Sequence, residues 1–300
     1  MSEYHVPVML AECLEGLNIK PNGTYVDVTY GGGGHSRAIL EKLGKKGRLV
    51  AFDQDTDAIN NKADDDRLLL VNHNFRYLKN FLKFHKAIPA DGLLADLGIS
   101  SYQIDEPEKG FAHRWDAPLD MRMDQNATQT AADIVNTYTE RELTTLFKEY
   151  GELDNAYKLA KAIVSERTKQ PIATTGQLKQ AVLRMLPRDA ENKYLSQIFQ
   201  ALRIEVNKEL EALKHLLKQS IDVISKGGRL VIMSYHSLED RMVKNFIKTG
   251  NIEGREDKDL YGNITRPFKG LGSKAITASE EEIARNPRAR SAKLRIAERV

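Results

Sequence analysis

Four consecutive glycines, Gly31–Gly34, stand between a predicted strand and a predicted helix, a pattern typical of a nucleotide-type cofactor site. Glycines let the backbone approach a ligand closely, and the first N–H groups of the helix have no partner within it. The next predicted strand ends at Asp53, whose carboxylate can accept both hydroxyls of a ribose. Ser36 occupies the place of the third small residue of the dinucleotide fingerprint. The loop therefore predicts an adenosine-containing ligand more firmly than NAD.

A second candidate group, Asp96, comes at the end of the predicted strand 92–97. In open parallel sheets ligands bind beyond the carboxyl ends of the strands, so we expect Asp96 to face the same crevice as the glycines. An aspartate in this position can equally well cap a helix or form a turn. The polar neighbours Ser100, Ser101, Gln103 and Asp105 favour a polar site.

Three further polar segments are hard to explain by packing: residues 110–124, 234–241 and 286–295. A single histidine such as His236 is more often a hydrogen-bonded structural residue than a catalytic one. The arginine-rich last segment can grip phosphates, or it can be a solvated terminal strand. The expected convergence of these segments on one sheet edge favours a function.

Composition sets broad limits on the protein class. The 300 residues are 41% hydrophobic and 29% charged, which is ordinary for a globular protein, and the net charge of +3 identifies no partner. No apolar run approaches the roughly 20 residues of a membrane span, and the first residues lack the pattern of a signal peptide, so we expect a cytoplasmic protein. Cys13 is the only cysteine, which excludes intrachain disulfides and thiolate zinc clusters, and we expect no metal.

The hydrophobic pattern predicts strands at both ends of the chain and helices in the middle. Short apolar runs predict strands at 25–28, 49–52, 68–71, 92–97, 229–234 and 291–297. Helices are predicted at 36–43, at 139–151 after a capping box, at 154–167, at 178–185, and as one long helix through 202–221 that ends at Gly227–Gly228. The stretch 252–273 is the most loop-like.

These elements predict an α/β fold with a doubly wound, mostly parallel sheet and an inserted helical domain. We expect the sheet domain to comprise residues 1–104 and 200–300. The helical insert is expected at 105–199.

Several motifs together resemble one family, the bacterial small-subunit (16S) ribosomal RNA cytosine-N4 methyltransferases (RsmH/MraW). They run in family order over nearly the whole chain. The most specific are Leu-Asp-Met-Arg-Met at 119–123 and His-Ser-Leu-Glu-Asp-Arg at 236–241; others lie at 5–10, 27–36, 53–55, 91–101, 199–207 and 286–291. The chain departs from the family pattern at Ala112-His113 and at Lys193–Ile198, both in or beside the expected substrate region.

The resemblance implies a Rossmann-like class I methyltransferase that uses S-adenosylmethionine. The implied acceptor is the exocyclic N4 of a cytidine in the decoding region of 16S ribosomal RNA, within the 30S subunit. The donor contacts that it implies are Gly33, Gly34, His35, Asp53 at the ribose, Phe75 at the adenine, Asp96 and Gln103. The insert would then recognise RNA.

The chemistry of amine methylation agrees with these residue types. Methylation at carbon 5 of cytosine needs a cysteine nucleophile, and Cys13 lies apart from every polar motif. Amine methylation needs the nitrogen held in line with the methyl group and an acceptor for its proton. Asp96 is the candidate acceptor, unless the donor occupies it fully. Other amino-methyltransferase families have Asp-Pro-Pro-Tyr here, where this chain has Asp-Leu-Gly-Ile.

The target base must leave its stack, so an aromatic or arginine platform is expected. The candidate substrate residues are Trp115, Arg122, His236, Arg288 and Arg290, with Phe111 and Arg114 as further platform candidates. Two other functions stay open: a non-catalytic RNA-binding or ribosome-assembly factor on a methyltransferase scaffold, and an NAD-dependent oxidoreductase. A homo-oligomer is compatible with the sequence.

Overall fold

The computed structural model describes residues 7–258, 261–262 and 264–300. The chain divides into two compact units, one made of residues 1–98 and 210–300 and the other of residues 99–209. The second unit extends beyond the predicted insert 105–199. It does so because the whole of helix α10 (Glu191–Asn207) belongs with it, packed against α6 and α7.

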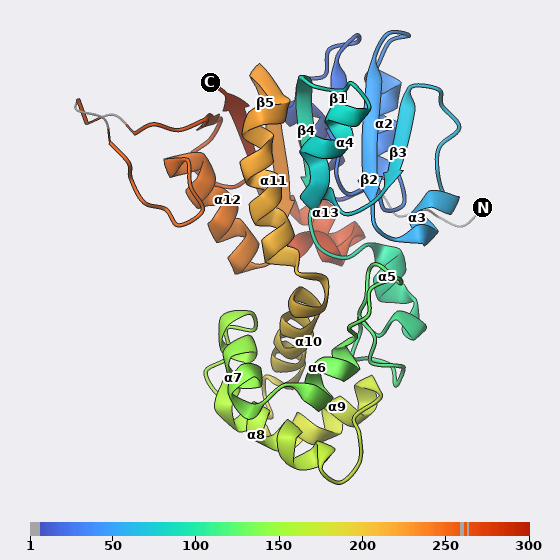
Figure 1. The fold of residues 1–300 in the computed structure, drawn as a ribbon, viewed down its shortest axis with the longest axis vertical. Coiled ribbons are helices and arrows are strands. Elements are labelled where there is room, and N and C mark those ends of the chain that lie inside the picture. The colour runs from blue at the N-terminus through green and yellow to red at the C-terminus, as the bar shows by residue number, and fades with distance from the viewer. Residues whose placement is uncertain (1–6, 259–260, 263) are drawn as a thin grey trace. The chain divides into compact units, whose positions relative to one another are not determined.

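The first unit is built on one sheet with the strand order β3-β2-β1-β4-β5-β7-β6 (Figure 1). The five strands from β3 to β5 are parallel, whereas β7 runs antiparallel to both β5 and β6. The strands are β1 (Thr24–Asp27), β2 (Arg48–Asp53), β3 (Leu68–Asn72), β4 (Ala90–Asp96), β5 (Ile224–Ser234), β6 (Phe268–Gly270) and β7 (Lys293–Arg299). The predicted doubly wound, mostly parallel α/β fold is confirmed.

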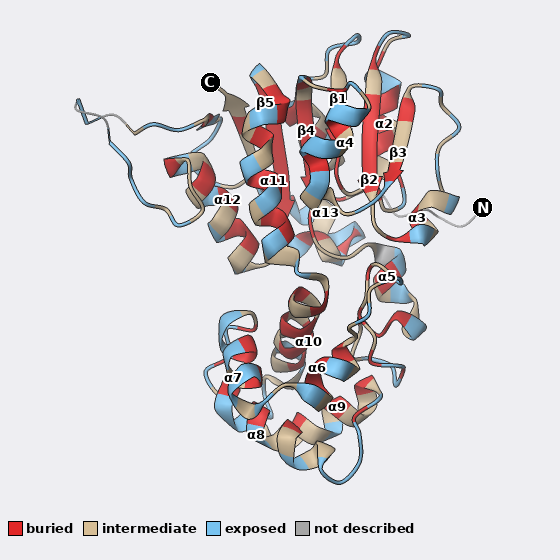
Figure 2. Cartoon of the chain, viewed as in Figure 1, coloured by how far each residue is buried: buried red, intermediate tan, exposed pale blue. Residues whose placement is uncertain are grey.

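Helices cover both faces of this sheet, and the strands between them are largely buried (Figure 2). Successive residues of a strand point to opposite faces, so Val26 packs in one core and Tyr25 in the other. The helices of one face are α4 (Leu78–Phe84), α11 (Glu209–Val223) and α12 (Ser237–Thr249). Those of the other are α1 (Leu10–Leu17), α2 (Gly34–Lys42) and α3 (Thr56–Asn60), joined by the segment that follows α13 (Glu280–Arg285).

The strand register brings three aspartates to the carboxyl edge of the sheet. Neighbouring strands β2, β1 and β4 end at Asp53, Asp27 and Asp96. Within the ladder Asp27 pairs with Ala51 of β2, and Asp96 pairs with Met233 of β5. The edge that carries the glycine loop therefore also carries a row of carboxylates.

The second unit is helical and has its own hydrophobic core. Its helices are α5 (Ser101–Asp105), α6 (Ala131–Thr137), α7 (Glu140–Glu149), α8 (Ala156–Arg167), α9 (Thr175–Val182) and α10. The predicted capping box is confirmed: Thr139 Oγ1 accepts from the Glu142 N–H at 3.2 Å, and the Glu142 carboxylate accepts from the Thr139 N–H at 2.7 Å. No helix among the residues described is long and apolar enough to cross a membrane.

The predicted single helix through 202–221 is wrong, because the chain breaks it at Lys208. Lys208 has the left-handed φ of +50°, so α10 ends at Asn207 and α11 starts at Glu209. The hydrophobic spacing of three and four residues continues across the break, although Leu202 packs in one hydrophobic core and Leu213 in another. Periodicity alone does not reveal a one-residue left-handed turn.

Two further boundaries differ from the sequence prediction. Helix α11 ends at Val223 and strand β5 begins at once at Ile224, so Gly227–Gly228 lies within an irregular part of β5 and does not end the helix. Strand β6 (Phe268–Gly270) lies in the stretch expected to be loop. It forms because β7 offers it an antiparallel edge, which the local sequence does not show.

The left-handed conformation of Lys208 predicts the order of stability of two variants. Lys208→Gly removes the steric conflict of Cβ and should keep or raise the urea midpoint, whereas Lys208→Val adds a branched Cβ and should cost about 1 kcal/mol. Lys218→Val, at an exposed position inside α11, controls for helix propensity. Equal urea midpoints for Lys208→Val and the wild-type protein would contradict the left-handed conformation of Lys208.

Candidate active site at the carboxyl edge of the sheet

The glycine loop is shaped by Gly33, which caps α2 with a left-handed φ of +76°. Its N–H donates to the Tyr30 carbonyl at 2.7 Å. A Cβ at this position would lie 2.7 Å from the Tyr30 Oη, so a glycine is required on both counts. The first N–H groups of α2 follow directly, at the positive end of the helix.

Asp53 ties this loop to the end of β2. One carboxylate oxygen accepts from the Gly31 N–H at 2.7 Å and the other from the Asp55 N–H at 2.8 Å. Burial raises the pKa of Asp53 to about 6, and the two N–H donors only partly offset this effect. The predicted ribose acid thus lies against the glycine loop.

Asp96 lies at the centre of a polar cluster that joins β1, β4, α2 and the end of β5. The Tyr235 hydroxyl donates to its Oδ1 at 2.7 Å, and His35 Nδ1 lies 3.8 Å from its Oδ2. The Asp96 N–H donates to Thr29 Oγ1 at 2.7 Å. Burial raises the pKa of Asp96 to about 6, yet 24% of its side-chain surface stays accessible, so a ligand atom can reach it.

His35 is buried between the N-terminal segment and Asp96. Its Nε2 lies 3.1 Å from the Val8 carbonyl, while Nδ1 faces Asp96. The imidazole therefore supports Asp96. The backbone N–H of His35 lies in the first turn of α2, where N–H groups have no partner within the helix.

Three residues of the site were missed by the sequence reasoning. Asp27 is 1% exposed; it accepts from Ser36 Oγ at 2.7 Å and from the Thr29 N–H at 3.1 Å. Ser36 thus holds α2 to β1 by a hydrogen bond where the fingerprint would use close packing. Tyr235 is the third, and burial together with the Asp96 charge keeps its pKa well above the ordinary value, so it stays a donor. The signal for Asp27 was available, since it lies near the end of the predicted strand 25–28, in a position similar to that of Asp53.

The structure also places Phe75 and Gln103, two further predicted contacts of the methyl donor. Phe75 opens a short 3₁₀ turn (Phe75–Tyr77) and is packed partly against the core. Asn74, which caps that turn, donates to Gln54 Oε1 at 2.7 Å and so links the end of β3 to the residue after Asp53. Gln103 belongs to the other unit; it is buried, and its amide oxygen accepts from the Ser100 N–H at 3.1 Å in a capping box.

His236 and Glu239 follow β5 at the start of α12. Glu239 Oε2 accepts from the Tyr235 N–H at 3.0 Å, and Glu239 Oε1 lies 3.3 Å from His236 Nε2. The His236 side chain is 7% exposed, and within the described part of the chain neither ring nitrogen has a well-directed hydrogen bond. Its Nε2 therefore lies near Glu239 without a well-directed hydrogen bond, and both nitrogens keep hydrogen-bonding capacity.

The basic tail divides into structural and exposed arginines. Arg295 pairs with Asp240 through two hydrogen bonds, at 2.7 and 3.2 Å, and Arg299 donates to backbone carbonyls. Arg288 and Arg290 lie in a 3₁₀ turn (Pro287–Ser291), with Arg290 exposed and Arg288 partly so. The candidate RNA contacts of the tail are thus the residues before β7.

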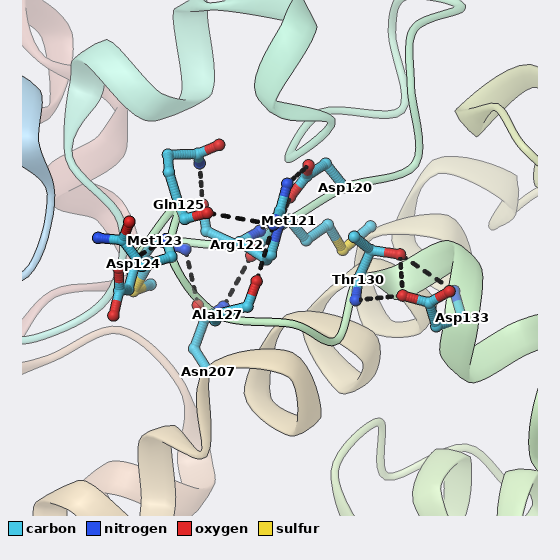
Figure 3. Close-up of polar contacts among 11 residues, drawn as sticks. Asp120, Met121, Arg122, Met123, Asp124, Gln125, Ala127, Thr130, Asp133 and Asn207 are labelled. Atoms are coloured by element: carbon cyan, nitrogen blue, oxygen red, sulfur yellow. Dashed lines mark hydrogen bonds and ion pairs between the residues drawn. The ribbon is translucent and has the colours of Figure 1, made fainter.

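Arg122 supports the loop that contains it (Figure 3). Its guanidinium binds both carboxylate oxygens of Asp120 at 2.8 and 2.7 Å and donates to the Ala127 carbonyl at 2.7 Å. Asn207 fixes the same loop, donating to the Met121 carbonyl and accepting from the Met123 N–H, both at 2.8 Å. Among the platform candidates, Phe111 is buried whereas Trp115 is 38% exposed.

The carboxyl edge has a negative electrostatic character. The charge of Asp27 raises the pKa of both Asp53 and Asp96, and Glu239 adds to the effect at Asp96. Such a site favours a ligand that carries positive charge, and it opposes a pyrophosphate, which NAD would place near the helix start. This is the chemistry of a sulfonium donor.

Comparison with known proteins decides the family, because the model of the MraW methylase family matches residues 2–300. The chain belongs to this family. A relative from Cytophaga hutchinsonii named ribosomal RNA small subunit methyltransferase H is 58% identical over 99% of both chains. Relatives of the same name from Bacteroides thetaiotaomicron and Christiangramia forsetii are 54% and 53% identical, over 99% and 100% of this chain and 97% and 99% of theirs.

Membership of the family confirms the predicted enzyme class, a methyltransferase with S-adenosylmethionine as cofactor. The residues at the carboxyl edge fit this donor. Asp53 and Asp96 offer carboxylate acceptors for hydroxyl and ammonium groups, and the start of α2 offers N–H groups for a carboxylate.

The raised pKa values predict how donor binding depends on pH. The ionised form of Asp53 accepts hydrogen bonds, and its pKa in the free protein is about 6, so binding should weaken as the pH falls through 6 toward 5. We expect the loss to approach tenfold per pH unit for each carboxyl group that releases a proton on binding. Calorimetric titration with S-adenosylmethionine at pH 5 to 8 measures this.

The variant Asp53→Asn measures how much Asp53 contributes to donor binding and to its pH dependence. At pH 8 it should weaken binding by about 1–3 kcal/mol through lost charged hydrogen bonds, and it should flatten the pH dependence. Asp222→Asn, an exposed aspartate paired with Lys79, makes the same charge change as a control. Unchanged affinity in Asp53→Asn would show that the ribose lies elsewhere.

Proposed function

We propose that this protein transfers a methyl group from S-adenosylmethionine to the exocyclic N4 of a cytidine in the decoding region of 16S ribosomal RNA, within the 30S subunit, in the cytoplasm. Its relatives, at 53–58% identity, carry the name ribosomal RNA small subunit methyltransferase H. The observation that carries the chemistry is the row of carboxylates at the carboxyl edge, with Asp96 accessible among them.

The donor residues have distinct proposed roles. Gly33 and Gly34 allow close approach and start α2, whose N–H groups, that of His35 included, suit the carboxylate of the methionine part. Asp53 accepts from the ribose hydroxyls, and Phe75 offers an aromatic face for the adenine. Asp96 and Gln103 complete the proposed set. The bound donor supplies an electrophilic sulfonium methyl group.

Asp96 is the proposed acceptor for the amine proton. The exocyclic N4 of cytosine is a weak nucleophile because its lone pair is conjugated with the ring. A carboxylate that accepts a hydrogen bond from this amine concentrates the lone pair on the nitrogen. Tyr235 occupies Oδ1 of Asp96, which leaves Oδ2, on the side of His35, for the amine. When the nitrogen–carbon bond forms, the bond between the methyl carbon and the donor sulfur would break and the sulfur would leave as a thioether. The proton on nitrogen would then pass to this carboxylate, or to water beyond it.

The single cysteine supports amine chemistry over covalent chemistry at carbon 5. Cys13 is fully buried in α1, and burial, followed by the charge of Asp96, raises the pKa of its thiol well above the ordinary value. A thiol in that state is a poor nucleophile. The proposed reaction is therefore a direct transfer to nitrogen.

The negative edge also weighs against the two other functions. An NAD-dependent oxidoreductase would have to accept a pyrophosphate near Asp53 and Asp96. A non-catalytic assembly factor would have no use for two carboxylates that keep raised pKa values at a stability cost. The proposed substrate contacts are Trp115, His236, Arg288 and Arg290, and the proposed role of Arg122 is indirect, since it holds its loop.

Methyl transfer to purified substrates tests the proposal. We expect N4-methylcytidine, identified by nucleoside mass spectrometry, in 30S subunits that lack the modification, and much less on naked 16S RNA. Calorimetry should show binding of S-adenosylmethionine and none of NAD. A folded, donor-binding protein that yields no N4-methylcytidine on either substrate would refute the proposal.

The exposed arginines of the tail predict a selective effect on RNA binding. Arg288→Glu/Arg290→Glu should weaken binding to 30S subunits, with a smaller dependence on salt, and leave donor affinity unchanged. Lys218→Glu/Lys226→Glu, two exposed lysines of the same unit, makes an equal charge change. If the affinity for 30S subunits changes neither with the tail substitutions nor with the salt concentration, these arginines do not contact RNA and are only solvated.

A further inference from the structure

A groove of about 420 Å³ lies in the helical unit, between the end of α8 and the start of α9. Pro171 and Ile172 supply apolar lining. The polar lining residues of the groove are Asp116, Glu166, Gln170, Gln177 and Gln180. All of its lining residues belong to the unit 99–209, whereas the carboxylate cluster around Asp96 belongs to the other unit.

The wall of the groove is fixed by hydrogen bonds between residues 115–119 and 173–176. Thr175 Oγ1 donates to the Trp115 carbonyl at 2.6 Å, and the Thr175 N–H donates to the Ala117 carbonyl at 2.9 Å. The Gly176 N–H donates to Asp116 Oδ1 at 3.0 Å. These bonds hold Asp116 and Gly176, which line the groove, next to the backbone of Trp115.

Trp115 forms a stack with its neighbour Arg114. The Arg114 guanidinium lies 3.9 Å from the centroid of the indole ring, and an ion pair with Asp105 at 2.7 Å orients it. Half of the Arg114 side chain and 38% of Trp115 remain exposed. Nucleobases stack on aromatic rings and on guanidinium planes in single-stranded RNA complexes.

The polar groups of the groove suit a base that donates hydrogen bonds. Carboxylates accept from the exocyclic amine of cytosine, and glutamine amides pair with the amine and ring nitrogen of adenine. The two carboxylates disfavour a phosphate inside the groove. Lys169, 66% exposed and paired with Glu166 at its rim, can meet a phosphate outside it.

We propose that this groove and the Arg114–Trp115 stack bind a second unpaired nucleobase of the substrate RNA, one that carries an exocyclic amine and is distinct from the methylated cytidine. The proposal rests on the proposed function, since it takes RNA as the substrate. Selection of a second base in this way adds specificity that the methyl-transfer site alone does not supply.

The chain offers a direct probe, because Trp115 is its single tryptophan. Its fluorescence should be quenched by hexanucleotides of cytidine or adenosine, and markedly less by uridine hexanucleotides, since uracil lacks an exocyclic amine. Equal quenching by all three would overturn the base selection, and no quenching by any would overturn the stack.

Variants test the same site with the 30S subunit. Trp115→Ala should weaken binding roughly tenfold or more, and Gln170→Ala/Gln180→Ala should remove the preference for cytidine and adenosine. Both should bind S-adenosylmethionine as the wild type does. Asn126→Ala/Asn192→Ala, at exposed amides of the same unit, is the control and should change neither measurement.

The outcomes separate the two proposals. If the wild type forms N4-methylcytidine while the groove variants bind and methylate 30S subunits normally, the groove proposal fails alone. If no N4-methylcytidine forms, the proposed function fails. Loss of 30S binding in Trp115→Ala with unchanged hexanucleotide affinity, measured by calorimetry because this variant lacks the fluorescent probe, would place a protein in the groove and overturn the assignment of a base.

Discussion

Three carboxylates side by side at one sheet edge, one buried and two partly exposed, are the constraint on which the site depends. The parallel register ends β1, β2 and β4 at Asp27, Asp53 and Asp96, and mutual repulsion would open this edge without nearby donors. The donors are Gly31 for Asp53 and Ser36 for Asp27, both in the segment that follows β1, and Tyr235 for Asp96, directly after β5. Burial raises the pKa of Asp53 and Asp96, and the charge of Asp27 adds to the effect. A ligand that carries positive charge would favour the ionised form of both groups.

Burial and partners, rather than residue type, separate the groups that support the structure from those left for a ligand. Arg122 and Arg295 look like RNA contacts in the sequence, yet each makes paired hydrogen bonds to an aspartate. Trp115 and Arg290 keep exposed surface. Arginine serves both purposes because its planar fork matches a carboxylate inside the protein as well as a phosphate outside it.

Much of the fold was predictable because the relevant signals are local. Buried parallel strands are short apolar runs, and the box at Thr139–Glu142 marks a helix start through contacts three residues apart. Strand β6 and the break at Lys208 were not predictable, since one depends on an edge offered by β7 and the other on a single left-handed residue. The role of Asn207 was not predictable either, because its amide holds a loop more than 80 positions earlier.

The sequence by itself determined the glycine loop, the acids at the strand ends, the inserted helices and the family resemblance, because these are patterns of neighbouring residues. Only the tertiary structure decided what each polar side chain does: that Ser36 bonds Asp27, that Tyr235 holds Asp96, and that Arg122 braces a loop. Such roles depend on which groups from distant segments meet in a buried, low-dielectric place, where an unpaired polar group is costly. The spacing of residues along the chain does not show which distant side chains come into contact.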